Sequence, residues 1–270
     1  MCLNGSIQIL QITDTHLFGD DEKLMGLSTT ESLEAVVETV RLNMSVGVIA
    51  PNLILLTGDI SQDYSLASYQ KILNLFSDFT CPIHAILGNH DNSYVFDNVY
   101  LPSKINLSKK IQMNDWLILL LNSHIPFRVG GRLSDQELSF LESELAANQD
   151  KHVIIFLHHH VIPIKALWLN KIALENAEQF FYVIDKYQNV VSVICGHTHQ
   201  DSLYRRNEVD YISTPSTCLQ FAPITDKFKI DLIMPGFRWF NLCDVGDYTT
   251  GVVRISNNKK FLPDLNAKGY

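Results

Sequence analysis

The chain has 270 residues, 46% of them hydrophobic, which is enough to bury a sizeable core, and we expect one domain over residues 1–270. Lys+Arg 21 and Asp+Glu 29 give a net charge of −8, and no basic run occurs, which argues against nucleic acid as a partner. The five cysteines lack CxxC spacing, so neither a disulfide framework nor a thiolate zinc site is indicated, and we expect reduced core residues. No apolar run reaches about 18 residues and no leader pattern opens the chain, which predicts a cytoplasmic protein without a membrane partner.

The first half of the chain alternates short apolar runs with amphipathic segments. The apolar runs predict strands over Ile7–Ile12, Asn52–Thr57 and Ile83–Leu87. Helices are predicted after the capping box Ser28-Thr29-Thr30-Glu31 and over Ser65–Phe79, whereas Asn92–Pro102 is expected to be irregular. This alternation favours parallel strands with helices packed outside.

The second half adds a predicted hairpin, two helices and several strands. The hairpin joins Leu107–Gln112 to Trp116–Asn122, and the helices follow Ser134-Asp135-Gln136-Glu137 and span about Asn176 to Lys186. The predicted strands are Val153–Leu157, Val190–Cys195, Leu203–Arg206, Val209–Thr214, Gly236–Leu242 and Gly251–Ile255. We expect the mostly β segment 200–256 to belong to the same domain and the tail 257–270 to be peripheral.

Polar clusters follow five of the predicted strands, directly where each strand ends. Seven of the ten histidines lie in these clusters, which are Asp14-Thr15-His16, Gly58-Asp59, Gly88-Asn89-His90-Asp91, His158-His159-His160 and Gly196-His197-Thr198-His199. Ligands of open α/β sheets gather outside the carboxyl ends of the strands, so the clusters are expected to meet in one crevice. A single histidine at a strand end is more often structural, but five clusters in one chain predict a functional site.

The residue types in these clusters indicate metal-dependent phosphate chemistry. Carboxylate, amide and imidazole donors without thiolate suit manganese, iron or zinc better than a closed structural zinc site. Two cations ~3.5–4 Å apart need a bridging ligand, and Asp59 is expected to supply it because a carboxylate can bridge and a neutral imidazole cannot. A water between two such ions becomes hydroxide near neutral pH and attacks phosphorus in line. The leaving alkoxide then needs a proton, and His90 is the expected donor because Asn89 offers the neighbouring metal ligand.

The order and spacing of these clusters resemble the calcineurin-like metallophosphoesterases. The resemblance rests on D-x-H at Asp14 and His16, G-D at Gly58 and Asp59, G-N-H-D at Gly88–Asp91, H-H at His158 and His159, and G-H-x-H at Gly196–His199. It implies an α/β fold, a four-layer sandwich of mixed β-sheets flanked by helices. It also implies one metal held by Asp14, His16, Asp59 and His199 and a second held by Asp59, Asn89, His158 and His197. Asn89 and His90 would contact the phosphate.

Four further segments are similar to the bacterial Icc/CpdA-type class III cyclic-nucleotide phosphodiesterases. They are Leu157–Pro163 with Trp168-Leu169, Leu174–Ala177, Thr214–Phe221 and Pro235–Arg238, and the likeness covers roughly residues 7–256. It implies hydrolysis of 3′,5′-cyclic AMP to 5′-AMP with a cyclic nucleotide as the small-molecule substrate. It also implies a homodimer as the expected assembly, because dimers are common among such relatives.

Several alternatives stay open at this level. The same ligands would serve 2′,3′-cyclic nucleotides, nucleotide-sugar diesters or phospholipid diesters, and a non-catalytic scaffold would keep the fold, usually without one of the ligands. His159 either supports a neighbouring ligand or contacts phosphate. Trp168 either stacks on a purine or packs in the core, and Thr214–Phe221 either lies near the metals or only packs. Arg238 is either a phosphate or dimer contact or a surface cation.

Overall fold

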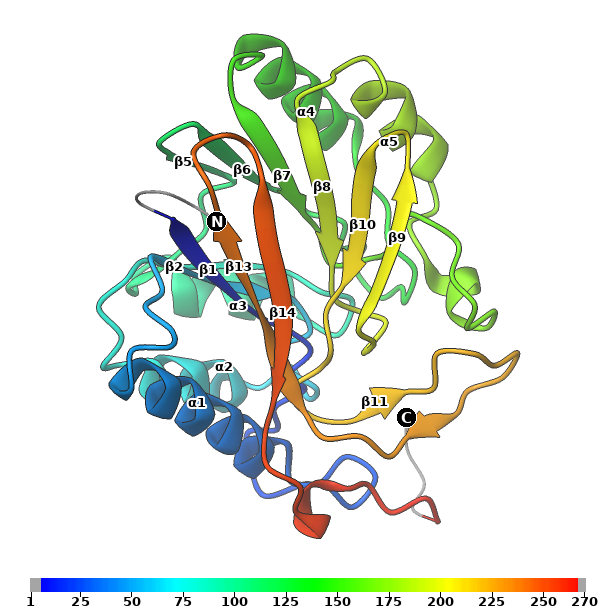
Figure 1. Ribbon diagram of the computed structural model, residues 1–270. Helices are drawn as coiled ribbons and strands as arrows, with labels where there is room; N and C mark the ends of the chain where they lie inside the picture. The colour runs from blue at the N-terminus through cyan, green and yellow to red at the C-terminus, as the bar shows by residue number, and fades with distance from the viewer. Residues whose placement is uncertain (1–5, 267–270) are drawn as a thin grey trace.

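A computed structural model, which describes residues 6–266, consists of two six-stranded mixed sheets packed against each other with helices on both outer faces (Figure 1). The first sheet contains, in spatial order, β14 (Tyr248–Arg254), β13 (Gly236–Leu242), β1 (Ile7–Ile12), β2 (Leu53–Thr57), β3 (Ile83–Ile86) and β4 (Ile105–Asn106). The second contains β5 (Lys110–Met113), β6 (Trp116–Leu120), β7 (His152–Phe156), β8 (Val190–Cys195), β10 (Val209–Ser213) and β9 (Ser202–Arg206). The expected sandwich of mixed sheets is confirmed.

The helices and short segments complete the layers around these two sheets. The first sheet is covered by α1 (Thr29–Ser45), α2 (Leu66–Leu75) and α3 (Ser93–Tyr100), and the second by α4 (Asp135–Ala147) and α5 (Ala177–Ile184). A two-stranded ribbon, β11 (Gln220–Phe221) and β12 (Ile230–Asp231), and two 3₁₀ turns, η1 (Leu169–Ile172) and η2 (Lys259–Phe261), lie outside the main layers. No helix within residues 6–266 is long and apolar enough to cross a bilayer.

Three separate apolar layers explain why the central strands are mostly apolar. Leu10 and Ile12 of β1 pack toward the helices of the first sheet, whereas Ile7 and Ile9 on the opposite face pack toward the second sheet. A third layer lies between the second sheet and α4 and α5. Because both faces of the central strands are buried, every position along them favours an apolar side chain.

Most predicted elements are present, and the largest error is at α3. The region 92–102 was expected to be irregular, but Asn92 caps a helix by accepting a hydrogen bond from the amide of Val95 at 3.1 Å. Phe96, Val99 and Tyr100 of this helix are buried, which is the i, i+3, i+4 spacing of one helical face. With only eight residues, the helix shows too little of this period in the sequence to be distinguished from an aromatic loop.

The C-terminal strands complete the first sheet. β13 pairs antiparallel with β1, with Ile7 opposite Leu242, and β14 pairs antiparallel with β13. Cys81, Cys195 and Cys218 are free thiols, as expected, but the expectation is wrong for Cys243, which is disulfide-bonded. Cys2 and the end of the tail, residues 267–270, lie outside the described residues.

Candidate metal centre

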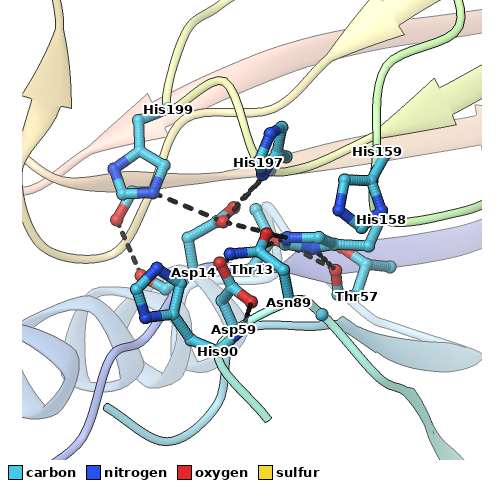
Figure 2. Close-up of polar contacts among 12 residues, drawn as sticks. Thr13, Asp14, Thr57, Asp59, Asn89, His90, His158, His159, His197 and His199 are labelled. Carbon is cyan, nitrogen blue, oxygen red and sulfur yellow. Dashed lines mark hydrogen bonds and ion pairs between the residues drawn. The ribbon is translucent and has the colours of Figure 1, made fainter. Parts of the chain in front are cut away.

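The five polar clusters meet at one place, but two sheets rather than one supply them. The loops after β1, β2 and β3 bring Asp14, His16, Asp59, Asn89 and His90 from the first sheet, and the loops after β7 and β8 bring His158, His197 and His199 from the second. Figure 2 shows the labelled donors among them turned toward one another, namely Asp14, Asp59, Asn89, His158, His197 and His199. The expected meeting of the five clusters in one crevice is therefore found, and it lies where the strand ends of the two sheets come together.

Asp14, His16, Asp59 and His199 form the first group of donor atoms. His16 Nε2 lies 3.2 Å from His199 Nε2 and 3.8 Å from Asp59 Oδ2, and His199 Nε2 lies 3.3 Å from Asp14 Oδ1. Ligands bound ~2.0–2.2 Å from one ion are separated by about 3.0–3.6 Å, depending on whether the geometry is octahedral or tetrahedral. These four buried side chains therefore have spacings close to those of ligands around a single cation.

Asp59, Asn89 and His158 form the second group, with His197 beside it. His158 Nε2 lies 3.2 Å from both Asp59 Oδ2 and Asn89 Oδ1. The ligand atoms of His158, His159 and His197 also lie within 4.8 Å of one another. The same oxygen of Asp59 faces both groups, whereas its other oxygen accepts a hydrogen bond from the amide of His90 at 2.7 Å. Asp59 thus occupies the shared position that a bridging ligand requires.

Each of three histidines uses one ring nitrogen for an outward hydrogen bond and turns the rest of the ring toward the centre. His199 Nδ1 lies 2.8 Å from the carbonyl of Leu219, and His158 Nδ1 lies 2.9 Å from the carbonyl of Thr57. His197 Nε2 lies 3.0 Å from the carbonyl of Ile172. A carbonyl oxygen can only accept, so these nitrogens carry the protons and donate. The Nε2 atoms of His158 and His199 face the oxygens of Asp59, Asn89 and Asp14, an arrangement of donor atoms that a cation between them would satisfy.

Burial and charge set the protonation of the centre in the ion-free protein. Burial lowers the pKa of His16 to about 3, and burial together with the nearby His159 and His158 rings lowers that of His197 well below its ordinary value. Burial alone would lower the pKa of His158 too, but the carboxylate of Asp59 raises it to about 9. Burial would raise the pKa of Asp59, yet the facing imidazoles of His158 and His90 hold it well below its usual range. The carboxylates are therefore ionised, and a proton on His158 stands where a cation would bind.

The backbone is strained at the donor residues themselves. Asp14, His16, Asp59, His197 and His199 all adopt positive φ angles, between 45° and 62°. This left-handed region costs a non-glycine residue about 1–3 kcal/mol and persists only where the surroundings enforce it. In the D-x-H sequence (Asp14, His16) and the H-x-H sequence (His197, His199), the positive φ angles turn both outer side chains toward the same centre.

Glycines precede three of the clusters because there is no space for a side chain. A Cβ on Gly88 would lie 2.1 Å from Asp59 Oδ1, and one on Gly58 would lie 2.5 Å from His158 Nδ1. A Cβ on Gly196 would lie 2.2 Å from Thr13 Oγ1. The G-D, G-N-H-D and G-H-x-H sequences therefore follow from close packing of the loops as well as from the donors they carry.

His90 differs from the other histidines in being only partly buried. Its ring lies edge-on to that of His16, with centroids 4.9 Å apart, and it shares a possible cation position with His16 and Asp59. This places His90 beside the donor groups and open to solvent, where a molecule bound at the centre would meet it. The geometry is compatible with the expected role in proton donation.

Asp91 is a supporting residue whose function the sequence did not reveal. Its Oδ1 accepts hydrogen bonds from the amides of Ile60 and Ser61 and from the hydroxyl of Tyr69, and its Oδ2 accepts one from the amide of Gly88. These bonds, 2.8–3.1 Å long, fasten the loop after β2 to the loop after β3. The sequence does not predict this role, because the role depends on which distant loop lies beside Asp91 in the folded chain.

His159 and the segment Thr214–Phe221 support the donors. The ring nitrogens of His159 contact Ser123 Oγ at 2.8 Å and the carbonyl of Val129 at 3.1 Å, so it packs against His197 as a supporting residue. In the segment, Leu219 accepts from His199, and the ring of Phe221 stacks on His199 with a centroid distance of 4.2 Å. The segment therefore lies near the centre and positions a donor.

Trp168 and Arg238 both have contacts within the protein. Trp168 packs edge-on against Phe221 at 5.1 Å and Phe228 at 5.3 Å, as the core alternative for this residue predicted. Arg238 is buried, pairs with Asp201 and donates to the carbonyl of Ser213 at 3.0 Å. The surface alternative for Arg238 is therefore wrong, because its buried guanidinium pairs with Asp201 and donates to Ser213 of the second sheet.

Comparison with known proteins agrees with this geometry. Residues 7–201 match the calcineurin-like phosphoesterase family. The chain is 38% identical to the 3′,5′-cyclic adenosine monophosphate phosphodiesterase CpdA of Vibrio vulnificus, over 98% of this chain and 96% of that one. It is 37% identical to the protein of the same name from Escherichia coli K12, over 98% and 95%.

Among solved structures, a dimetal phosphatase from Danio rerio is similar in fold. The TM-score is 0.64 at 14% identity, covering 93% of this chain and 99% of the other. This likeness concerns the fold alone, whereas the family match covers most of the chain and includes every donor residue described above. The chain belongs to the calcineurin-like phosphoesterase family.

Proposed function

We propose that this protein is a binuclear metal-dependent phosphodiesterase that hydrolyses 3′,5′-cyclic AMP to 5′-AMP. The observation that carries the proposal is the pair of buried donor groups that share the Oδ2 atom of Asp59. Relatives 37–38% identical over almost the whole chain are named as cyclic AMP phosphodiesterases, which supports this substrate.

The proposed ligands are those named from the sequence. One ion is assigned to Asp14, His16, Asp59 and His199, and the other to Asp59, Asn89, His158 and His197. Two cations held there would supply a nucleophilic oxygen at neutral pH and neutralise the charge of a phosphate diester. Manganese, iron or zinc suits this mixture of nitrogen and oxygen donors.

His90 and Asn89 are the proposed contacts to the phosphate. The ring of His90 is partly exposed beside the first group, so it can meet a bound diester and give a proton to the leaving alkoxide. The amide of His90 donates to Asp59 Oδ1, which holds this residue in place independently of its ring. Replacement of the ring should therefore change the reaction more than the structure.

Two alternatives use the same fold. Other diesters, including 2′,3′-cyclic nucleotides and nucleotide-sugar or phospholipid diesters, would require the same donors. A scaffold without turnover is disfavoured, because all seven proposed ligands and His90 are present and brought together.

Three broader proposals accompany this function. Residues 1–270 are proposed to form one domain, which the pairing of β13 with β1 supports. A homodimer is proposed as the assembly. The cytoplasm is the proposed compartment, supported by three free thiols, although the disulfide at Cys243 argues against a reducing environment.

The test compares three substrates with metal-stripped protein reconstituted with manganese. They are 3′,5′-cyclic AMP, 2′,3′-cyclic AMP and bis(4-nitrophenyl) phosphate, ranked by kcat/KM. We expect the 3′,5′-cyclic nucleotide to lead and the metal-stripped protein to be inactive. A lead by either other diester would overturn the substrate assignment, and inactivity toward all three with metal bound would favour the scaffold.

A further inference from the structure

A pocket of about 230 Å³ lies directly beside the candidate metal centre. It is lined by Tyr64, Asn89, Asp91, Asn92, Ser93, Tyr94, His124, Pro126 and Phe127. Asn89 belongs to both places, since its Oδ1 lies 3.2 Å from His158 Nε2 in the second donor group. A molecule whose phosphate is bound at the donors can therefore extend into this pocket without leaving the site.

Three aromatic side chains from separate segments border the pocket and are unusually exposed. Phe127 in the β6–α4 loop is 97% exposed, Tyr94 in the first turn of α3 is 77% exposed, and Tyr64 in the β2–α2 loop is 49% exposed. Isolated exposed apolar residues are ordinary, but a cluster around one cavity indicates a binding surface.

The backbone holds two of these rings in strained conformations. Phe127 and Tyr64 have φ angles of 62° and 61°, in the left-handed region that aromatic residues rarely adopt. Such strain concentrates at ligand-binding positions. Both rings stay exposed in the ligand-free protein, so core packing does not explain their strained φ angles.

The character of the lining selects the chemical class of the ligand. The lining residues, all of them in the described part of the chain, include no Lys or Arg, so the pocket offers no cation for a second phosphate. It combines aromatic rings with the polar groups of Asn92, Ser93 and His124. A neutral, flat heterocycle with polar edges fits this surface.

We propose that this pocket binds the nucleobase of the cyclic nucleotide, with Phe127 and Tyr94 as the stacking residues. The proposal rests on the phosphodiesterase function given above and adds the determinant of base recognition to it. Trp168, the sequence-based candidate for this role, is packed between Phe221 and Phe228.

The test uses the manganese-loaded variants Phe127→Ala and Tyr94→Ala on two substrates. One is 3′,5′-cyclic AMP, and the other is methyl riboside 3′,5′-cyclic phosphate, which has the same ring diester and no base. Loss of one stacking ring should lower kcat/KM for cyclic AMP by about 5- to 150-fold, mainly through KM, and leave the base-free substrate unchanged. Tyr182→Ala is the matched control, because this tyrosine on α5 is 73% exposed and does not line the pocket.

Each remaining outcome decides a different claim. Equal loss on both substrates, or no loss on either, overturns the base pocket and leaves the phosphodiesterase function standing. If the wild-type enzyme hydrolyses neither substrate, the proposed function fails, and calorimetric binding of adenosine then decides the pocket alone. Weaker adenosine binding by Phe127→Ala than by the wild type would support the pocket, and equal or absent binding by both proteins would overturn it.

Discussion

Asp91 fastens two of the loops that carry the metal donors, and replacing it should loosen both. Asp91→Asn keeps one carbonyl oxygen for the amides of Ile60 and Ser61 and the hydroxyl of Tyr69. Its new amide group then faces the amide of Gly88, which is also a donor. The hydrogen bond from the amide of Gly88 is lost, and two N–H donors then face each other.

The size of the effect follows from these four bonds. A hydrogen bond to a charged group contributes about 1.5–3 kcal/mol. Burial and the charge of Asp59 raise the pKa of Asp91 to about 7. The neutral side chain of Asp91→Asn therefore also relieves repulsion from Asp59, which offsets part of the lost hydrogen bond. We expect the free energy of unfolding to fall by about 1.5 kcal/mol. Asp91→Ala instead leaves four buried donors unsatisfied at ~1–3 kcal/mol each, a total comparable to the ~5–15 kcal/mol stability of a whole domain.

Urea unfolding of the metal-free wild type, Asp91→Asn and Asp91→Ala proteins measures this order of stability. We expect wild type to be the most stable, the asparagine variant to be modestly weaker, and the alanine variant to be largely unfolded. Asp97→Asn, an exposed aspartate on α3, is the control and should match the wild type. An alanine variant as stable as the asparagine variant would refute the argument that these bonds hold the loops.

The other predictions concern the donors, the proton donor and acid stability. Asp59→Ala should abolish turnover and lower the metal content seen by mass spectrometry, because both donor groups lose their shared oxygen, and near-normal activity would contradict the bridging role. His90→Ala should keep its metal while kcat falls ~10²–10⁴-fold, and loss of metal would instead make His90 a ligand. Burial lowers the pKa of His84 below its ordinary 6.5, so the unfolded chain takes up a proton first as the pH falls and the fold loses stability toward acid. His84→Gln should therefore lose less stability on acidification than the wild type, as urea midpoints at neutral and mildly acidic pH would show, and an equal loss in both would exclude this histidine as a cause.

The predictable part of this molecule is the part that local chemistry determines. Apolar runs and polar breaks place the central strands and their donor clusters, and Ser28, Ser65 and Ser134 cap their helices by accepting from the amide three residues later. Each of these features depends on neighbours within a few positions. The clusters that hold the seven proposed ligands could be located for the same reason, since each lies at the end of an apolar run, whereas their assignment to two ions came from the family resemblance.

The rest depends on contacts between residues far apart in the chain. β13 pairs with β1 across more than two hundred residues, and nothing local in either strand specifies that partner. The division of the donor loops between two sheets follows from such pairings. Phe221 and Asp91 were not recognised as supports because stacking on His199 and bonding to the loop after β2 are visible only once the chain is folded.

Because the donors come from two sheets, the apolar layer between the two sheets affects how far apart the donors lie. That layer, which includes Trp116, Phe156 and Phe240, separates the sheet carrying Asp14 and Asp59 from the sheet carrying His158 and His199. Protein interiors are packed as densely as organic crystals and transmit changes of volume. The volume of these core side chains thus contributes to the distance between Asp14 and Asp59 on one sheet and His158 and His199 on the other, which are the donors proposed to share ions.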